Sequence, residues 1–482
     1  MKTSNWLQWA MAIAVGWAAV GTAAAGPKIE TAPDRAKTTL NPRLRQIGTI
    51  KPRRANEIPG SNWTLGCETL DRDFADFQQY KEYIVPLGIK TIRLQGGWAK
   101  TEKAKGTYDF TWLDTIIDDA RGRGLNILLE TDYGNPIYKG GGGWDLAGGF
   151  PTSEEGLAAW DRWVEAMALR YKGKVRDWAM WNEPDINKQH KPGDIAAFNI
   201  RTAEIIKRVI PDARIAGLSL ASSSPKLLED CLKVLAEKGK VDLFHWFIYH
   251  GYAFNPDTSY QNVEELKATL AKYSKTAKMR QGENGCPSEK ATKFALSNHP
   301  WTESSQAKWD LRRMLGDLGH DVESAVFTIC DFNHTGREIN RKGLLWATAD
   351  KTVEKIKLAY YSVQNAVAVF DSTLERVREP AVAVMYGKGT ASYAYRHKTT
   401  GRALIVLWDN SGTPDDAFVT RPAQVVVKGL AMKDPVWVDL VSGRVYAIPA
   451  DRITSAGAFT IFKDVPLYDA PVLIAEKGLV LK

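Results

Sequence analysis

Between residues 62 and 370 the sequence alternates two patterns, and this alternation constrains the fold more than any other feature. Short runs rich in β-branched and aromatic residues are each followed by a longer stretch with apolar residues near the helical period. Such an alternation predicts parallel strands joined by crossover helices. The predicted strands are Trp63–Cys67, Lys90–Leu94, Leu125–Glu130, Arg176–Trp181, Arg214–Ser219, Leu243–Tyr249, Lys278–Gly282 and Ser324–Cys330.

The number of strand–helix units favours a barrel over an open sheet. Eight units in roughly 310 residues match a (β/α)8 TIM barrel with loop insertions. The alternative, a doubly wound sheet, usually carries a glycine-rich phosphate loop after its first strand, and "LGCETLDRD" contains none. The predicted helices are Phe74–Val85, Trp112–Arg121, Glu155–Tyr171, Ile195–Val209, Pro225–Glu237, Val263–Tyr273, Gln306–Leu318 and Val353–Phe370.

The segments on either side of the barrel read differently. From residue 379 onward, short strands such as "RALIVLWDN" and "PVWVDLV" follow one another with turn signals and no helix, which predicts an antiparallel β-sandwich. We therefore expect a signal peptide at 1–25, an N-terminal arm or linker at 26–60, the catalytic barrel at 61–375 and the β-sandwich domain at 376–482.

The first 25 residues predict export. Lys2 is followed by an apolar run from Trp6 to Val20 and by the small-residue stretch "GTAAAG", a pattern typical of a cleaved secretory signal. The alternative is a membrane anchor that stays attached, but the run is rich in Ala and Gly and only weakly hydrophobic. A secreted or periplasmic protein with no membrane contact after cleavage is expected. Its cysteines could pair, and the sequence does not choose among the pairings of Cys67, Cys231, Cys286 and Cys330.

Composition limits the partners. The formal net charge is +8, and no basic run is interleaved with aromatic residues, so nucleic-acid binding is not expected. Seventeen tryptophans are present, and the flat apolar indole with its polar edge suits sugar rings. No metal or other cofactor is expected, and the oligomeric state stays open.

Active-site residues of a barrel lie at the C-terminal ends of its strands. The fourth and seventh predicted strands each lead into a glutamate, Glu183 in "AMWNEPDIN" and Glu283 in "MRQGENG". Asn-Glu-Pro-Asp is also good turn chemistry, so the first of these motifs is weak alone. Together the two glutamates suit the hydrolysis of a glycosidic bond, which needs a carboxyl group on each side of the bond. Other polar residues at strand ends are Arg93, Gln95, Asp132, Tyr133, Asn182, His250, Tyr252, Asn284, Asp331 and Asn333.

The motif "WNEP" on a fourth strand, with a glutamate after the seventh, resembles clan A of the glycoside hydrolases, of which families 5 and 39 are examples. The resemblance implies a retaining enzyme on a (β/α)8 barrel, and the β-sandwich resembles the one appended in family 39. It implies that Glu183 is the acid/base and Glu283 the nucleophile. It also implies substrate-site roles for Asn182 at the sugar 2-hydroxyl, for Arg93 near the nucleophile, and for His250 and Tyr252 in an "HxY" motif.

Aromatic and basic residues near the predicted mouth bear on the substrate. Many clan members have a tryptophan at the end of strand eight as the floor of the sugar site, whereas this strand reads "FTICDFNH". Trp98, Trp144 and Trp346, in loops on the predicted active-site side, are expected to contact substrate, with Trp144 inside a glycine-rich rim at 138–150. An anionic glycan stays open as substrate because of the basic residues Lys100, Lys139, Lys188, Arg337 and Arg341.

The sequence therefore predicts an exported retaining glycoside hydrolase. It would cleave O-glycosidic bonds of a poly- or oligosaccharide by double displacement. A transglycosylase would use the same carboxylates, and a non-catalytic carbohydrate-binding protein on a decayed barrel is the alternative outside enzymes. The sugar, the linkage and endo or exo action are left open.

Overall fold

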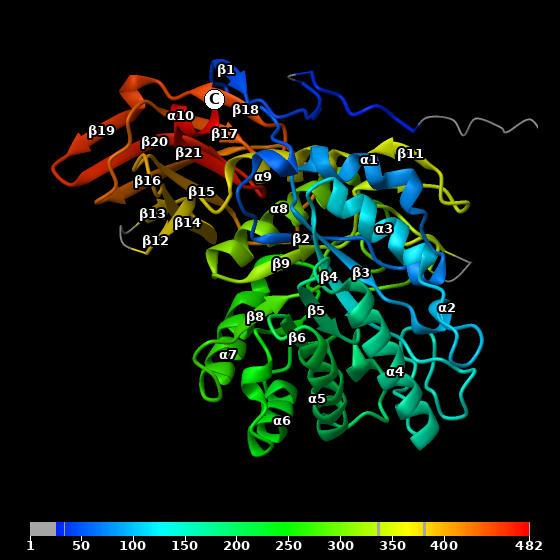
Figure 1. Ribbon diagram of the computed structural model, residues 1–482. Helices are drawn as coiled ribbons and strands as arrows, with labels where there is room; N and C mark the ends of the chain where they lie inside the picture. The colour runs from blue at the N-terminus through cyan, green and yellow to red at the C-terminus, as the bar shows by residue number, and fades with distance from the viewer. Residues whose placement is uncertain (1–25, 33, 335–337, 379–381, 482) are drawn as a thin grey trace, which may run out of the picture.

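The computed structural model describes residues 26–32, 34–334, 338–378 and 382–481, so the predicted signal peptide lies outside it. Eight parallel strands close into a barrel in the order of the sequence, which confirms the predicted fold class (Figure 1). Each strand lies within a few residues of its predicted position. The strands are β2 (Trp63–Gly66), β3 (Thr91–Gln95), β4 (Asn126–Thr131), β5 (Asp177–Met180), β6 (Arg214–Leu220), β7 (Trp246–Tyr249), β8 (Lys278–Gln281) and β9 (Glu323–Val326).

Helices follow the strands and cover the outside of the barrel (Figure 1). They begin where the local chemistry allows: the Ser153 side chain accepts a hydrogen bond from the Gly156 amide at the start of α4. The helices are α1 (Phe77–Leu87), α3 (Thr111–Gly122), α4 (Glu154–Tyr171), α5 (Pro192–Val209), α6 (Pro225–Glu237), α7 (Tyr260–Ala271), α8 (Glu303–Gly319) and α9 (Leu358–Val369), with the short α2 (Trp98–Thr101) and α10 (Lys477–Val480). Across the described ranges, none of them is both long and apolar enough to cross a membrane.

One predicted helix is too long. The segment predicted to be helical from Val353 begins as a strand, β11 (Val353–Ile356), which pairs antiparallel with β10 (Leu345–Ala347). In this strand Val353 is buried, while Glu354 and Lys355 are exposed. The apolar ends of "VEKI" pack against the barrel, and its polar middle faces solvent, so the helix starts only at Leu358.

The C-terminal domain consists of two antiparallel sheets. One has the order β1-β18-β17-β21-β15-β14-β12 and the other β13-β16-β20-β19. The Trp437 indole donates a hydrogen bond to the Pro466 carbonyl, which joins the two sheets. The strands are β12 (Leu374–Val377), β13 (Val382–Met385), β14 (Thr390–His397), β15 (Ala403–Asp409), β16 (Arg421–Lys428), β17 (Pro435–Asp439), β18 (Arg444–Ala447), β19 (Ile453–Ala456), β20 (Phe459–Leu467) and β21 (Val472–Glu476).

The N-terminal arm is not only a linker, because part of it joins the larger sheet of the β-domain. Its residues Gln46–Thr49 form β1, which pairs antiparallel with β18 and completes one edge of the larger sheet. The other edge is β12, which begins just before the predicted start of the β-sandwich. The β-domain is therefore built from both ends of the chain. All four cysteines of the described chain are buried and unpaired.

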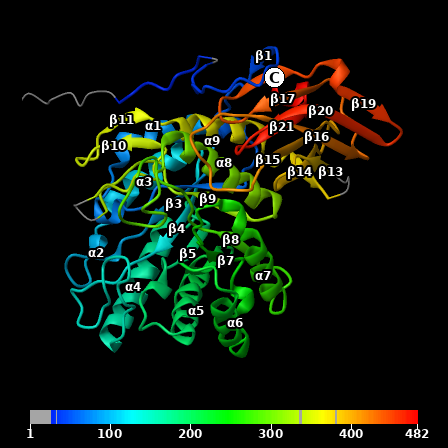
Figure 2. The ribbon, with the colours of Figure 1, turned by 180° about the vertical axis from the view of Figure 1, so that it is seen from behind.

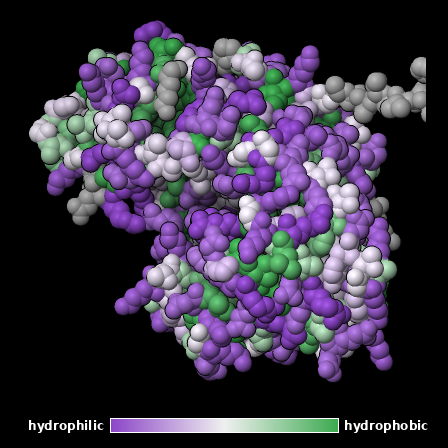
Figure 3. Space-filling model, viewed as in Figure 1, coloured by the Kyte–Doolittle hydropathy of each residue, from purple (hydrophilic) through white to green (hydrophobic). Residues whose placement is uncertain are grey.

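The β-domain rests on α8 and α9, at one end of the molecule in both ribbon views (Figures 1 and 2). The Lys308 ammonium on α8, fully buried, donates to Asp469 and to the Ala417 carbonyl, each at 2.7 Å. On α9, Asn365 donates to the Leu440 carbonyl at 3.1 Å. Figure 3 shows the step where this domain overhangs the barrel, on a face that is mainly hydrophilic.

We predict that Lys308→Met weakens the protein by about 3 kcal/mol in free energy of unfolding, because it leaves Asp469 without its buried partner. Urea denaturation would measure the loss. The matched control is Lys226→Met, which breaks an ion pair with Asp230 whose lysine side chain is 75% exposed, and which should cost less than about 0.5 kcal/mol. Equal losses in the two variants would contradict a role for Lys308 in holding the domains together.

Candidate active site

Two glutamates lie side by side at the C-terminal end of the barrel. Glu183 follows β5, and Glu283 follows β8. One carboxylate oxygen of Glu183 lies within 4.8 Å of one of Glu283. The backbone of Glu183 turns sharply, with a left-handed φ of 51°, and its amide donates to the Ser219 carbonyl of β6 at 2.8 Å. The turn chemistry of "NEPD" and the placement of a carboxylate at the barrel mouth are thus the same feature.

Arg93 on β3 is the cation to which the acidic groups are bound. Its Nη1 donates to Glu68 at 2.9 Å and to Glu283 at 3.1 Å. Its Nη2 donates to both oxygens of Glu130, at 3.0 and 2.9 Å, and to the amide oxygen of Asn182 at 2.7 Å. Arg93 is only 1% exposed. A buried guanidinium of this kind fixes the positions of all the groups it binds.

The two residues of the "HxY" motif each reach a glutamate. His250 is fully buried, and its Nδ1 lies 2.8 Å from Glu183 and 3.9 Å from Glu283. The Tyr252 hydroxyl donates to Oε1 of Glu283 at 2.9 Å. Asn182 donates in turn to the Tyr133 hydroxyl at 2.9 Å. The structure therefore brings together Glu183, Glu283, Asn182, Arg93, His250 and Tyr252.

The surroundings shift the pKa values of the two glutamates in opposite directions. Burial raises the pKa of Glu183, against the hydrogen bond from His250, and the charge of Glu283 raises it further. For Glu283, burial acts in the same sense, but His250, Arg93 and the Tyr252 hydroxyl together outweigh it and lower the pKa. These opposite shifts favour the protonated form of Glu183 and the ionised form of Glu283.

Two of the acids around Arg93 were not expected from the sequence. Glu68 directly follows the first strand, and Glu130 is the fifth residue of β4. Both are buried, and burial raises the pKa of Glu68 to about 7 despite the Arg93 cation. The signal was available: a carboxylate inside the apolar run "NILLET" needs a buried cation, and Arg93 occupies the neighbouring strand.

The three tryptophans expected at the substrate have different fates. Trp98 is fully buried and stacked on Trp163, and its indole donates to Glu102 at 2.5 Å. The short helix α2 turns its ring into the core, so the predicted substrate contact of Trp98 is wrong. Trp144 is 50% exposed on the glycine-rich loop. That loop is fixed near the site, because Asp145 pairs with Arg72 at 2.7 Å. Substrate contact at Trp144 stays a prediction.

Trp346 does not fold back to form a floor for the sugar site. The Arg341 guanidinium covers its ring at 3.7 Å. The residue lines a groove of about 800 Å³ together with Trp301 and Phe418, and neither candidate glutamate lines that groove. The position after the eighth barrel strand belongs to Phe327, which is 7% exposed and packs edge-on against Phe332.

Most basic residues expected at the mouth have partners. Lys100 pairs with Asp73 at 2.6 Å, and Arg341 pairs with Asp331 at 3.1 Å. Lys188 donates to a backbone carbonyl at 3.1 Å, and Arg337 lies outside the described residues. These side chains therefore do not by themselves indicate an anionic substrate.

The group Glu183, His250 and Glu283 could also offer one ligand atom each to a cation. However, His250 already hydrogen-bonds Glu183 at 2.8 Å, and the Arg93 guanidinium lies 3.1 Å from Glu283. A metal ion would have to break the first contact and would be repelled by the second. The donor set fits an acid–base pair better than a metal centre.

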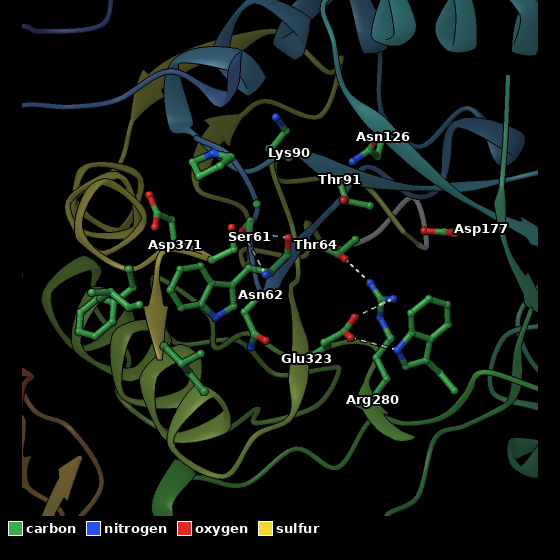
Figure 4. Close-up of a pocket in the computed structure, with 18 of the residues that line it drawn as sticks. Ser61, Asn62, Thr64, Lys90, Thr91, Asn126, Asp177, Arg280, Glu323 and Asp371 are labelled. Carbon is green, nitrogen blue, oxygen red and sulfur yellow. Dashed lines mark hydrogen bonds and ion pairs between the residues drawn. The ribbon is translucent and has the colours of Figure 1, made fainter. Parts of the chain in front are cut away.

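A second cavity, of about 390 Å³, lies at the opposite end of the barrel (Figure 4). Charged side chains that line it have partners within the cavity. Arg280 forms an ion pair with Glu323 at 3.4 Å, and the Trp246 indole donates a hydrogen bond to the same carboxylate at 3.1 Å. Side chains at the N-terminal ends of barrel strands usually serve stability, and this self-paired set fits that role.

Fold and site together define the class: a (β/α)8 barrel with glutamates after its fourth and seventh strands and an appended β-domain, the architecture expected of clan A. A family model described as Glyco_hydro_42, beta-galactosidase, matches residues 66–136, the segment that carries Glu68, Arg93 and Glu130. Beta-galactosidase BgaA of Clostridium cellulovorans is 39% identical over 62 residues, which are 13% of this chain. The match spans only 9% of that relative's length.

Solved structures resemble the chain over most of its length. A family 39 glycoside hydrolase from Bacteroides cellulosilyticus has a TM-score of 0.60 and 16% identity, over 89% of this chain and 83% of its own. A monomeric beta-xylosidase from Caulobacter crescentus has a TM-score of 0.56 and 15% identity, over 89% and 97%. The catalytic domain of GH30 xylanase C from Talaromyces cellulolyticus has a TM-score of 0.54 and 11% identity, over 90% and 98%. These likenesses confirm the (β/α)8 barrel with an appended β-domain.

We predict that Tyr252→Phe raises the pKa of Glu283, because the ionised carboxylate loses a hydrogen bond worth roughly 1.5–3 kcal/mol. Carbon-13 NMR titration of labelled glutamate side chains would measure this shift without any substrate. Tyr386→Phe, in the β-domain, is the control and should leave Glu283 unchanged. An unaltered titration of Glu283 in Tyr252→Phe would contradict the assigned contact.

Proposed function

We propose that this protein is a retaining glycoside hydrolase that cleaves O-glycosidic bonds of a poly- or oligosaccharide. The observation that carries the proposal is the pair of opposed pKa shifts on two carboxyl groups whose oxygens lie within 4.8 Å. Retaining glycosidases need one protonated acid and one ionised nucleophile, with carboxyl groups about 5–5.5 Å apart. The resemblance of the fold to glycosidase structures supports the same assignment.

The reaction would proceed in two displacements. Glu183 protonates the glycosidic oxygen while Glu283 attacks the anomeric carbon, so the bond to the leaving group breaks as the bond to Glu283 forms. Glu183, now ionised, then takes a proton from water, and the hydroxyl oxygen displaces Glu283 from the sugar. Arg93 and Tyr252 hold Glu283 in place and ionised before the first step. Asn182, held by Arg93, would contact the sugar hydroxyl next to the anomeric carbon.

The two glutamates should fail in different ways when they are replaced. We expect Glu183→Gln to lower kcat/KM about 10²- to 10⁴-fold on substrates with poor leaving groups, and Glu283→Gln to lose turnover on all substrates. A panel of aryl glycosides and polysaccharides would measure this. Glu289→Gln, on the same loop as Glu283 but paired with Arg341, is the matched control. A carbohydrate-binding protein would show ligand binding unchanged in both variants and no turnover.

Azide would separate the two roles. In Glu183→Ala it should attack the glycosyl-enzyme and yield a glycosyl azide of retained configuration, whereas in Glu283→Ala it should attack the substrate directly and yield the inverted azide. Proton NMR of the first-formed products gives the configuration. The reverse pattern would exchange the assigned roles. Sugar transfer to an added acceptor in place of hydrolysis would make the enzyme a transglycosylase.

The activity should depend on pH in a bell-shaped profile, and the pKa shifts of Glu283 and Glu183 determine its acid and alkaline limbs. Activity should rise with pH as Glu283 ionises, at a pKa below its ordinary value, and fall as Glu183 loses its proton, at a pKa above its ordinary value. Replacing Glu183 by Gln should remove the alkaline limb and keep the acid one. Turnover should be unchanged by EDTA. An alkaline limb that survives in Glu183→Gln would mean that another group is the acid.

We also propose that the enzyme acts outside the cytoplasm, as the signal-like residues 1–25 indicate. The expected result is a mature protein that begins near Gly26 in the periplasmic or extracellular fraction. N-terminal sequencing of the protein from each fraction would test this, and full-length protein confined to the cytoplasm would contradict it.

A further inference from the structure

Lys342 is a buried cation beside the candidate active site. It lies on the segment that follows β9, where its carbonyl accepts hydrogen bonds from the Thr328 amide and the Gln306 side chain, each at 3.3 Å. The residue is only 2% exposed. Its ammonium lies 5.7 Å from the centre of the Tyr252 ring and 5.9 Å from that of the Phe294 ring. The backbone is thus fixed, and the charge faces two aromatic rings.

Among the described residues, Lys342 has no counter-ion in contact with its ammonium, unlike two other buried lysines. Within the described ranges its Nζ makes neither a hydrogen bond nor an ion pair. By contrast, the buried Lys357 pairs with Asp331 at 2.6 Å, and the buried Lys308 pairs with Asp469 at 2.7 Å. A buried ammonium without a contacting carboxylate is costly, because it has left water and gained no hydrogen-bonded opposite charge. Burial accordingly lowers the pKa of Lys342 to about 8, so most of it still carries its charge at pH 7.

The ammonium of Lys342 lies close to the proposed position of the reacting sugar. The Tyr252 ring next to Lys342 carries the hydroxyl that donates to Glu283 at 2.9 Å. The Phe294 ring on its other side lies 5.3 Å from the His334 ring. Lys342 therefore lies beside a residue that contacts Glu283, next to the position at which the proposed sugar would be held.

We infer that Lys342 is a specificity-determining residue that binds an anionic group, a carboxylate or a sulfate ester, on the sugar held against Glu283. The inference rests on the proposed function and names its substrate class: glycans that contain uronic acids or sulfated sugars. The bound anion would form the ion pair that Lys342 does not form with the described residues of the protein. The charge-assisted contact should be worth about a 10- to 100-fold preference over the matched neutral sugar.

The test is a binding measurement that does not depend on turnover. Calorimetric titration of the Glu283→Gln protein would use glucose, glucuronate and glucose 6-sulfate, and the corresponding galactose set. We expect the acidic sugars of at least one set to bind about 10- to 100-fold more tightly than the neutral one. The carboxylate and sulfate members identify which anion is recognised. Equal binding of neutral and acidic sugars in both sets, or no binding of any of them, would overturn the inference.

Variants of Lys342 then locate the preference. Lys342→Met should abolish it and Lys342→Arg should keep it, whereas Lys139→Met, which removes an exposed lysine from the rim with the same change in net charge, should leave it intact. A preference that survives in Lys342→Met would also overturn the inference. Hydrolysis of neutral glycosides that depends on Glu183 and Glu283, together with no anion preference, would uphold the proposed function while the role of Lys342 fails.

A purely electrostatic role for Lys342, holding Glu283 ionised, gives a different result. It predicts equal losses on neutral and acidic substrates and a shift of the acid limb of the pH profile. Under our inference, the preference for acidic sugars instead declines as pH rises past about 8, where Lys342 loses its proton. The ionisable groups that face it are Tyr252, Glu283, Cys286 and Glu338.

The thermal stability of Lys342→Met should rise, although its preference for acidic sugars is lost. Because the pKa of Lys342 is lower in the folded protein than in the unfolded chain, the unfolded chain binds its proton more tightly, and the charge destabilises the fold at pH 7. Lys342→Met should therefore raise Tm at pH 7, by a margin that narrows as pH rises above 8. A variant that is more stable but has lost its preference for acidic sugars is the expected outcome, and a lower Tm would contradict the unpaired state of this lysine.

Discussion

The guanidinium of Arg93 is the interaction on which the site depends. It is buried at the centre of the barrel mouth and contacts three carboxyl groups, Glu68, Glu130 and Glu283. A single cation cannot balance three buried anions. Burial raises the pKa values of Glu68 and Glu130, whereas the charges of His250 and Arg93 and the Tyr252 hydroxyl lower the pKa of Glu283. The charges and hydrogen-bond donors around each acid thus shift its pKa in a different direction, although all three acids share one cation.

The same arrangement separates the two reacting groups. Glu183 and Glu283 come from strands far apart in the sequence, and a closed parallel barrel brings the C-terminal ends of those strands together. Glu183 is buried and hydrogen-bonded to His250. Glu283 is instead bound by the Arg93 guanidinium and by the Tyr252 hydroxyl. Two side chains of identical chemistry thus have pKa values shifted in opposite directions by their surroundings alone.

The sequence was sufficient for the barrel because its periodic signals are local. Each strand was placed within a few residues, and the residues at strand ends included both glutamates, Arg93 and the "HxY" pair. What could not be predicted depends on contacts between distant segments. Trp98 and Trp144 look alike in the sequence, yet a one-turn helix buries the first and a glycine-rich loop exposes the second. That Lys342 has no ion pair within the described part of the chain is likewise a property of packing, which no local pattern records.

The pairing of β1 with β18 joins residues 46–49 to residues 444–446. Since synthesis proceeds from the N-terminus, β1 must wait, unpaired, until nearly the whole chain has been made. Contacts so distant in sequence form late, after the entropy of closing a very long loop has been overcome. A strand that is among the first to be synthesised thus pairs only after most of the chain has been made, and a chain interrupted before residue 444 would leave β1 open to strands of other molecules.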